Sequence, residues 1–316
     1  MQVQEIAKYA SAVVAELDKV IIGKTETIRL ATIAMMCNGH VLIEDIPGVG
    51  KTTLAKALAH AIGGEFRRMQ FTPDLLPADI TGSSIYSQKE GTFEFRAGPV
   101  FGNVVLVDEI NRATPKTQSA LLEAMEERQV TVDGVSRMLP RPFFVIATQN
   151  SVEMTGTYPL PEAQLDRFFM RVSLGYPSRD EESRVLSAQQ LSHPLENVQT
   201  VIDIPTMLAI QSGIRDVFVH DAVRDYIVDL VRSTRDNNQL VMGASPRGSL
   251  YLLRGAQAHA AMNNLDYVRP EDVKAVAPAI LAHRVIPKAE LRVRGASTEA
   301  VVSRILDEVG GPVPVG

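Results

Sequence analysis

The sequence has little of what several classes of protein require. It contains a single cysteine, Cys37, so no internal disulfide can form and a disulfide-stabilised scaffold is excluded. No apolar run approaches the roughly 18 residues that a membrane-spanning helix needs. Glu5, Lys8 and Glu16 interrupt the N-terminal segment, which leaves no apolar region of a signal peptide there. These absences predict a soluble, cytoplasmic chain in which Cys37 is a small core residue.

An excess of basic charge is also missing. The 37 acidic residues outnumber the 32 lysines and arginines, which gives a net charge of −5 and no electrostatic footprint for nucleic acid. The six histidines are scattered, and no pair has the spacing of metal ligands. With 45% apolar and 22% charged residues the chain has the composition of an ordinary globular protein with a sizeable core.

Short apolar runs alternate with helical stretches in the first half of the chain. Residues 41–44, 104–107 and 143–147 have the continuous apolar character of central parallel strands, and 66–70 and 169–174 are weaker candidates. The pattern predicts an α/β fold with a five-stranded parallel sheet between helices. One expected helix of this region spans 52–62, where Leu54, Leu58 and Ile62 recur at a four-residue spacing.

The hydrophobic periodicity of the sequence changes after Pro177. From there on the sequence is helical in pattern, and the expected helices span 178–190, 204–216, 221–237, 245–263 and 270–281. We therefore expect two domains, an α/β domain over residues 1–177 and an all-helical domain over residues 178–316.

A glycine-rich turn joins the strand 41–44 to the helix that follows it. The run Gly48-Val49-Gly50-Lys51-Thr52 lets backbone N–H groups surround a phosphate at the N-terminus of a helix. Lys51 is then placed to reach the β- and γ-phosphates, and the Thr52 hydroxyl to ligate Mg²⁺. The phosphate-loop pattern G-x-x-x-x-G-K-[ST] has glycine where this chain has Asp45, at the start of the loop.

Polar side chains follow two of the predicted strands. Asp108 and Glu109 come directly after the strand 104–107, and Asn150 comes soon after the strand 143–147. Ligand sites of open α/β sheets lie at this edge, where Asp108 can hold Mg²⁺ and Glu109 can polarise an attacking water. Asn150 can orient the same water, or it can be a turn-forming asparagine. Together with the phosphate loop, these residues predict a nucleoside triphosphatase.

Longer strings make the sequence resemble the MoxR-type AAA+ ATPases over nearly its whole length. They span residues 68–82, 108–113, 147–150 and 156–168. Besides Asp45, the chain departs from the family at Ser151, where proline is common. The resemblance implies an AAA+ core followed by a helical lid, and ATP with Mg²⁺ as cofactors.

The resemblance also implies roles for individual residues. Asn150 corresponds to sensor 1, Arg167 to an arginine finger that reaches the γ-phosphate of a neighbouring subunit, and Arg247, after the helix-capping pair Ser245-Pro246, to sensor 2. With Glu109 these are the expected catalytic residues. Two roles remain open for Arg112, a contact to the neighbouring subunit and a structural role within its own chain. The residues expected to bind ATP are Ile22, Gly23, Pro47, Gly48, Val49, Gly50, Lys51, Thr52, Thr53 and Asp108, of which Thr52 and Asp108 would also hold Mg²⁺.

Two further segments are predicted as β-hairpins. Residues 129–139 contain an Asp133-Gly134 turn and resemble the pre-sensor-1 hairpin, whereas 83–95 resemble the helix-2 insert of the same AAA+ branch. They either face a central pore and grip a substrate or extend the sheet.

The resemblance implies a ring, expected to be a hexamer, that remodels or matures a client, such as a protein with a von Willebrand factor A (VWA) domain or a metalloenzyme. A magnesium-chelatase-type motor subunit and a nucleic-acid motor are the alternatives, and the acidic net charge argues against the second.

Overall fold

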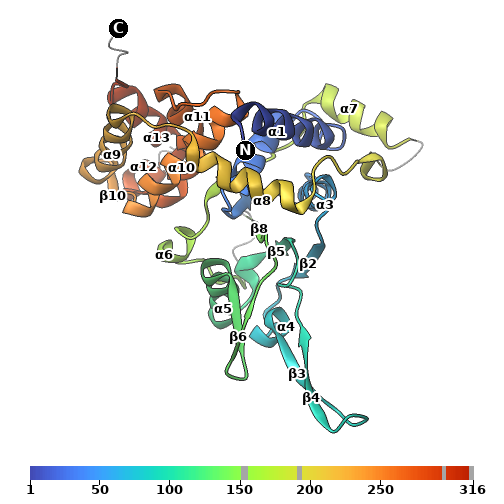
Figure 1. Ribbon diagram of the computed structural model, residues 1–316. Coiled ribbons are helices and arrows are strands. Elements are labelled where there is room, and N and C mark those ends of the chain that lie inside the picture. Colours follow the sequence, from blue (N-terminus) through green and yellow to red (C-terminus); the bar gives the residue numbers. More distant parts are fainter. Residues whose placement is uncertain (151–155, 191–193, 294–296, 313–316) are drawn as a thin grey trace.

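The computed structural model describes residues 1–150, 156–190, 194–293 and 297–312 (Figure 1). Its central sheet has five parallel strands in the order β2-β5-β8-β1-β9. The strands are β1 (Val41–Glu44), β2 (Phe66–Gln70), β5 (Val104–Asp108), β8 (Phe144–Gln149) and β9 (Met170–Val172). This confirms the predicted five-stranded parallel sheet.

The alternation of side chains along these strands divides the core into two layers. Val41 and Ile43 pack into one hydrophobic cluster, while Leu42, between them, packs into the other. The same division holds for β5 and β8, whose residues are nearly all buried. Because both faces of the sheet are covered, its three central strands β5, β8 and β1 are largely continuous apolar runs and lack the alternating pattern of a half-exposed sheet.

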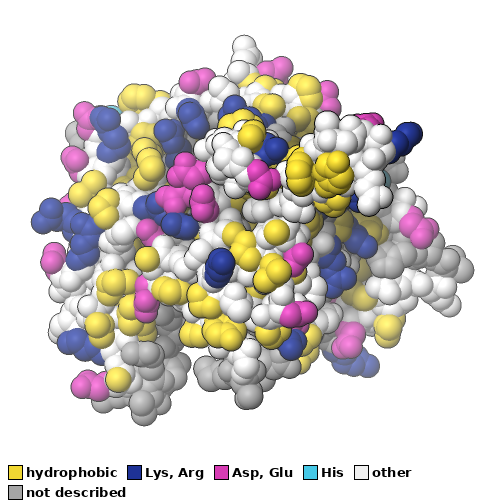
Figure 2. Space-filling model, turned by 90° about the horizontal axis from the view of Figure 1, so that it is seen from below, with side chains coloured by type: hydrophobic (Ala, Val, Ile, Leu, Met, Phe, Trp, Pro, Cys, Tyr) yellow, Lys and Arg dark blue, Asp and Glu magenta, His cyan; other side chains and the backbone are white. Residues whose placement is uncertain are grey.

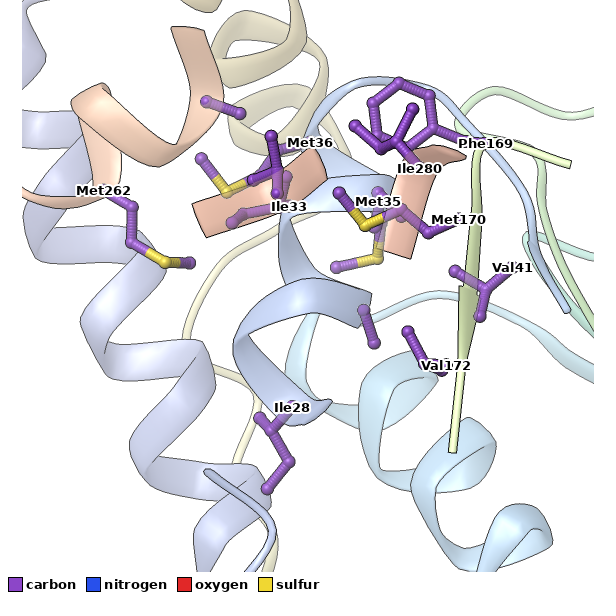
Figure 3. Close-up of a cluster of buried hydrophobic side chains, with 14 of the residues drawn as sticks. Ile28, Ile33, Met35, Met36, Val41, Phe169, Met170, Val172, Met262 and Ile280 are labelled. Atoms are coloured by element: carbon purple, nitrogen blue, oxygen red, sulfur yellow. The ribbon is translucent and has the colours of Figure 1, made fainter. Parts of the chain in front are cut away.

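Helices from the first half of the chain cover both faces. On one face lie α1 (Val3–Asp18), α2 (Thr25–Met36) and α3 (Lys51–Ala61); on the other lie α4 (Pro77–Thr81) and α5 (Pro115–Glu127). Figure 3 shows the first layer, where Met35 and Met36 of α2 gather with Val41 and Met170 of the sheet. This core continues without a break into the second half of the chain, to which Ile280 belongs.

The second half is mainly helical in its described residues, with one short ribbon. Its helices are α7 (Arg179–Ala188), α8 (Ile204–Gly213), α9 (Asp221–Asp236), α10 (Pro246–Met262), α11 (Pro270–Leu281), α12 (Ala289–Val293) and α13 (Thr298–Glu308). The strands β10 (Leu240–Met242) and β11 (Ile286–Pro287) add an antiparallel ribbon that the sequence pattern does not predict. Since α1 packs against α10, the two halves share a broad contact.

Short elements connect these layers. They are the 3₁₀ turns η1 (Ile110–Arg112), η2 (Pro194–Asn197), η3 (Ile214–Asp216) and η4 (Ala282–Arg284) and the short helix α6 (Glu162–Leu165). Among the described residues, no helix is both long and apolar enough to cross a membrane.

Two β-hairpins project from the sheet on the side away from the helical region (Figure 1). One pairs β3 (Gly82–Ser87) with β4 (Thr92–Ala97), and the other pairs β6 (Gln129–Val132) with β7 (Val135–Met138). The second turns at Asp133 and Gly134, which both have positive φ (53° and 74°), as the predicted Asp-Gly hairpin turn requires.

Candidate functional site

The glycine-rich turn between β1 and α3 has the backbone of a phosphate-binding loop. Gly48 and Gly50 have φ of 85° and 96°, in the left-handed region that favours glycine, and Gly50 is the N-cap of α3. Lys51 begins the helix, and its Nζ donates a hydrogen bond to the backbone oxygen of Asp45 at 2.9 Å. This bond places the ammonium over the loop, where backbone N–H groups at the helix N-terminus attract an anion.

This loop opens onto a pocket of about 380 Å³. The residues lining it are Pro47, Gly48, Gly50, Lys51, Thr52, Thr53, Arg68, Gln70, Asp108, Glu109, Thr148 and Asn150. Of the four expected catalytic residues, Glu109 and Asn150 therefore lie here. Partial burial lowers the pKa of Lys51, and the nearby carboxylates of Asp45, Asp108 and Glu109 act in the opposite direction.

Asp108 is the last residue of β5 and is buried. Its Oδ2 accepts a hydrogen bond from Arg68 Nε on the adjacent β2 at 2.7 Å, and its Oδ1 accepts one from the Thr148 hydroxyl on β8 at 3.4 Å. Partners from the strands on both sides thus hold the carboxylate at the sheet edge.

Glu109 follows in a left-handed conformation, with φ of 56°. Its backbone N–H donates to the Thr148 hydroxyl at 2.9 Å, and its Oε2 accepts a hydrogen bond from Arg112 Nη1 at 3.0 Å. Because the backbone turns at Glu109, the Glu109 side chain leaves the strand in a different direction from the Asp108 side chain. Arg112 pairs with this candidate base within the same chain.

The pocket suits a nucleoside triphosphate with Mg²⁺. The Thr52 hydroxyl and the Asp108 carboxylate supply hard oxygen donors, which Mg²⁺ prefers. The Cβ that a side chain at Gly48 would have meets no atom within 4 Å, so it is the backbone angle, and not crowding, that favours glycine there. The loop is therefore open to a phosphate on its outer side.

A second hollow of about 220 Å³ adjoins the phosphate pocket and shares Gly48, Gly50 and Thr53 with it. The other residues lining it are Val20, Ile21, Ile22, Lys24, Val49, Gly175, Pro177, Val185, Gln189 and Pro194. This largely apolar lining is suitable for a nucleoside base, and it includes the predicted Ile22 and Val49. Gly23 is not part of the lining; a Cβ there would collide with the side chain of Glu181, which packs closely against this glycine.

The other two expected catalytic residues lie elsewhere. Arg167 and Arg247 do not line the phosphate pocket; both line a separate cavity of about 370 Å³. Glu126, near the end of α5, joins them: Arg167 Nε is 3.0 Å from its Oε2, and Arg247 Nη2 is 2.7 Å from its Oε1. Arg247 stands in the first turn of α10, as its capping sequence predicts, and Ser245 is the N-cap.

Sequence reasoning misses three residues that line the phosphate pocket. Arg68 and Gln70 belong to β2, and Thr148 to β8, so each enters the site only through the strand order. Alternation along a strand gives a signal for Arg68 and Gln70, because residues two apart share a face. Ser151, the second departure from the family pattern, lies outside the described residues.

Comparison with known proteins identifies AAA-type domains in this chain. The model of the ATPase family associated with various cellular activities (AAA) matches residues 40–170, and the AAA lid domain model matches residues 232–305. The uncharacterized protein YeaC of Bacillus subtilis is 50% identical over 95% of this chain and 94% of its own length. Chaperone MoxR1 of Mycobacterium tuberculosis is 40% identical over 94% of this chain and 81% of its own length.

Two further comparisons extend over nearly the whole chain. Protein MoxR of Paracoccus denitrificans is 32% identical over 95% of this chain and 94% of its own. The crystal structure of an ATPase candidate from Cytophaga hutchinsonii superposes with a TM-score of 0.90 and 40% identity, covering 98% of this chain and 97% of its own. The chain therefore belongs to the MoxR family of AAA+ ATPases, with an α/β nucleotide-binding core followed by a lid.

Proposed function

We propose that this ATPase hydrolyses ATP in the pocket between the glycine-rich loop and the ends of β5 and β8, with Mg²⁺ as the metal. The observation that carries the proposal is the convergence of Lys51 and Thr52 with Asp108 and Glu109 on one pocket. Lys51 binds the β- and γ-phosphates, and Thr52 and Asp108 hold the metal, which neutralises phosphate charge when bound. The apolar hollow formed by Ile22 and Val49 receives the adenine.

Glu109 acts as the general base on the attacking water, and Asn150 orients that water. Both side chains line the phosphate pocket. The Thr148 hydroxyl fixes the backbone of Glu109, while Arg112 holds its carboxylate through the 3.0 Å ion pair. The pair with Arg112 engages Oε2, and since a carboxylate has two oxygens with several acceptor positions, it is compatible with transfer of a proton to Glu109.

Arg167 and Arg247 act on the nucleotide of a neighbouring subunit in a ring, which we expect to be a hexamer. Their joint position at Glu126, outside the chain's own phosphate pocket, supports this role. An arginine that reaches the γ-phosphate from a neighbour stabilises the charge of the transition state. Hydrolysis then depends on assembly.

The ring would act as a chaperone-like motor on a client protein, with a VWA-domain protein or a metalloenzyme as the class of client. The relative named Chaperone MoxR1 supports a chaperone role. Figure 2 looks onto the face from which the hairpins project, where hydrophobic side chains lie among charged ones. Tyr86, Phe93 and Met138 of the hairpins are exposed to 53%, 73% and 66%, which is suitable for gripping a polypeptide.

Two substitutions test the site. Lys51→Ala removes the ammonium from the phosphates, so ATP affinity should fall by about tenfold to a hundredfold. Glu109→Gln keeps the shape but not the basicity of the side chain, so ATP should still bind while turnover falls by about 10² to 10⁴. Calorimetric titration of ATP and a phosphate-release assay with Mg²⁺ measure the two effects.

Lys56→Ala is a matched control, because Lys56 lies on the same helix but does not line the phosphate pocket. It should leave both ATP affinity and turnover at the wild-type level. Undiminished ATP affinity in Lys51→Ala would refute the phosphate site, and normal turnover in Glu109→Gln would assign the base to another residue.

A further inference from the structure

Asp45, the residue that stands where the phosphate-loop pattern has glycine, is buried and accepts four hydrogen bonds through its carboxylate. Oδ1 accepts one from the backbone N–H of Ile46 at 2.9 Å. Oδ2 accepts three from a single segment: the N–H groups of Leu174 at 2.6 Å and Gly175 at 2.8 Å, and the hydroxyl of Ser173 at 3.2 Å. One side chain thus joins the start of the phosphate loop to the segment after β9.

The segment 173–175 leads from the sheet into the wall of the base hollow. Gly175 and Pro177 line that hollow, as does Val185 of α7 a short way further along the chain. Lys24, which also lines the hollow, is tied to the residue that follows this segment, because its Nζ donates to the backbone oxygen of Tyr176 at 2.9 Å. A displacement of residues 173–175 would therefore move Gly175 and Pro177 relative to the rest of the lining.

Glycine at position 45 would make none of these bonds. Asp45 does not have a positive φ, so its backbone does not need glycine. Without the carboxylate, the backbone N–H groups of Leu174 and Gly175 would lose their acceptor, and an unpaired buried donor is costly. The bond from Lys51 goes to the backbone oxygen of residue 45, an acceptor that glycine and asparagine also have.

We infer that Asp45 is a positioning residue for the base of the nucleotide: its carboxylate holds residues 173–175 so that the base hollow is formed before ATP binds. The inference rests on the proposed ATP site and specifies how one part of it works. Asp45 contributes to the affinity for the adenosine part of ATP and little to the affinity for the phosphates. The departure from the glycine of the phosphate-loop pattern is then a functional feature of this chain.

The test compares ATP with inorganic tripolyphosphate, which carries the phosphates without the adenosine. In Asp45→Gly, which restores the phosphate-loop pattern, and in Asp45→Asn, which turns an amide donor toward backbone donors, ATP affinity should fall about tenfold. Tripolyphosphate affinity should change by less than about twofold, because the loop and Lys51 are intact. Both affinities are measured by calorimetric titration.

Glu44→Gln is the matched control, since it removes the same charge one residue earlier. Glu44 pairs with Arg171 and makes no bond to residues 173–175. It should leave both affinities unchanged. Wild-type ATP affinity in a folded Asp45→Gly would overturn the inference, and so would an equal loss of ATP and tripolyphosphate affinity, which would place the effect in the phosphate loop.

Hydrogen exchange of the protein without nucleotide tests the contact separately. The amides of Leu174 and Gly175 should exchange at least about tenfold faster in Asp45→Asn than in the wild type, and at the wild-type rate in Glu44→Gln. Unchanged exchange in Asp45→Asn would overturn the inference. Failure of the wild type to bind ATP would instead refute the proposed site and leave this exchange result standing.

A milder variant covers the case in which Asp45→Gly does not fold. Ser173→Ala deletes only the hydroxyl bond to Oδ2. It should weaken ATP binding by about two- to threefold and leave tripolyphosphate binding unchanged. If ATP binding is unaffected in Ser173→Ala and in Asp45→Asn, Asp45 does not position the base hollow.

Discussion

Thr148 contacts both acidic residues at the end of β5 and is itself buried. Its hydroxyl accepts the N–H of Glu109 and donates to the carboxylate of Asp108. A hydroxyl can do both at once, because it carries one donor and two acceptor positions. Thr148 thus helps to orient both the candidate base Glu109 and the candidate metal ligand Asp108.

Thr148→Val should lower both stability and turnover. Valine has nearly the same shape but leaves the N–H of Glu109 without a partner, which costs about 1–3 kcal/mol in the free energy of unfolding. Because Glu109 is then less well placed, turnover should fall about tenfold while ATP affinity is kept. Urea unfolding, calorimetric titration and phosphate release measure the three quantities.

Thr148→Ser is the control, since serine keeps the hydroxyl and loses only a methyl group. It should retain turnover close to that of the wild type. Equal loss of turnover in the serine and valine variants would show that packing, and not the hydroxyl, is what matters at this position.

At this scale, sequence reasoning reaches the candidate residues that lie in segments contiguous in the chain. Lys51 and Thr52 follow the glycine turn directly, and Asp108 and Glu109 follow a recognisable strand. Such reasoning does not find that Thr148 contacts both acidic residues, because this contact depends on β8 lying beside β5. Arg167 and Arg247 are found only by resemblance, and their shared partner Glu126 depends on the contact between core and lid.

The bounds of the elements follow local pattern except where a distant partner intervenes. The expected strand 169–174 ends at Val172, because the N–H groups of Leu174 and Gly175 bond to the carboxylate of Asp45 and not to a neighbouring strand. The expected strand 143–147 continues as far as Gln149, because Thr148 and Gln149 pair with β1. In both cases the deciding contact is remote in sequence.

His40, directly before β1, connects three elements. Its Nδ1 accepts the N–H of Val145 on β8 at 3.0 Å, and its Nε2 is 3.2 Å from the backbone oxygen of Met125 on α5. These partners suit a neutral ring with its proton on Nε2. Burial, with a further contribution from the charge of Arg128, holds the pKa of His40 well below its ordinary value of 6.5.

Stability should therefore fall as the solution becomes acidic. Below pH 6.5 the unfolded chain takes up a proton on His40 while the folded chain does not, so the unfolded state is favoured. The contribution of the neutral His40 ring to the free energy of unfolding is present in full above pH 6.5. Below this pH it is lost at about 1.4 kcal/mol per pH unit for each such histidine. Burial lowers the pKa of His283 in the same way. Urea unfolding at a series of pH values from neutral to mildly acidic measures the slope.

The variant His40→Gln tests the contribution of His40 to the acid sensitivity apart from that of the other titratable groups. The glutamine amide can accept from one partner and donate to the other, but it does not titrate. The variant should lose stability less steeply on acidification than the wild type does. An unchanged slope would show that His40 does not contribute to the acid sensitivity.

The core and the lid are joined by charged groups as well as by the continuous hydrophobic core. Asp166, next to Arg167, accepts hydrogen bonds from Ser245 at 2.9 Å and from Arg284 Nε at 2.9 Å. Glu126 binds Arg167 of the core and Arg247 of the lid. A movement of the lid would therefore change the contact of Arg247 with Glu126, while Glu126 and Arg167 both belong to the core.

The proposed role of Arg167 at the nucleotide of a neighbouring subunit predicts complementation between two inactive variants. Arg167→Ala should bind ATP but hydrolyse it poorly, and Lys51→Ala should not bind it well. When the two are mixed, some interfaces place the intact Arg167 of one subunit against the intact phosphate loop of the other. If subunits mix at random in equal amounts, about a quarter of the interfaces are complete, so phosphate release should recover partially.

The double variant Lys51→Ala/Arg167→Ala is the matched control for this experiment. Mixed with Arg167→Ala, it leaves no Arg167 in any ring, and mixed with Lys51→Ala, it leaves no intact phosphate loop, so neither mixture should recover. Recovery confined to the two single variants identifies the interface between subunits as the place where the site is completed. If subunit exchange is demonstrated and the two single variants show no recovery, Arg167 acts within its own subunit or only supports the contact between core and lid through Glu126.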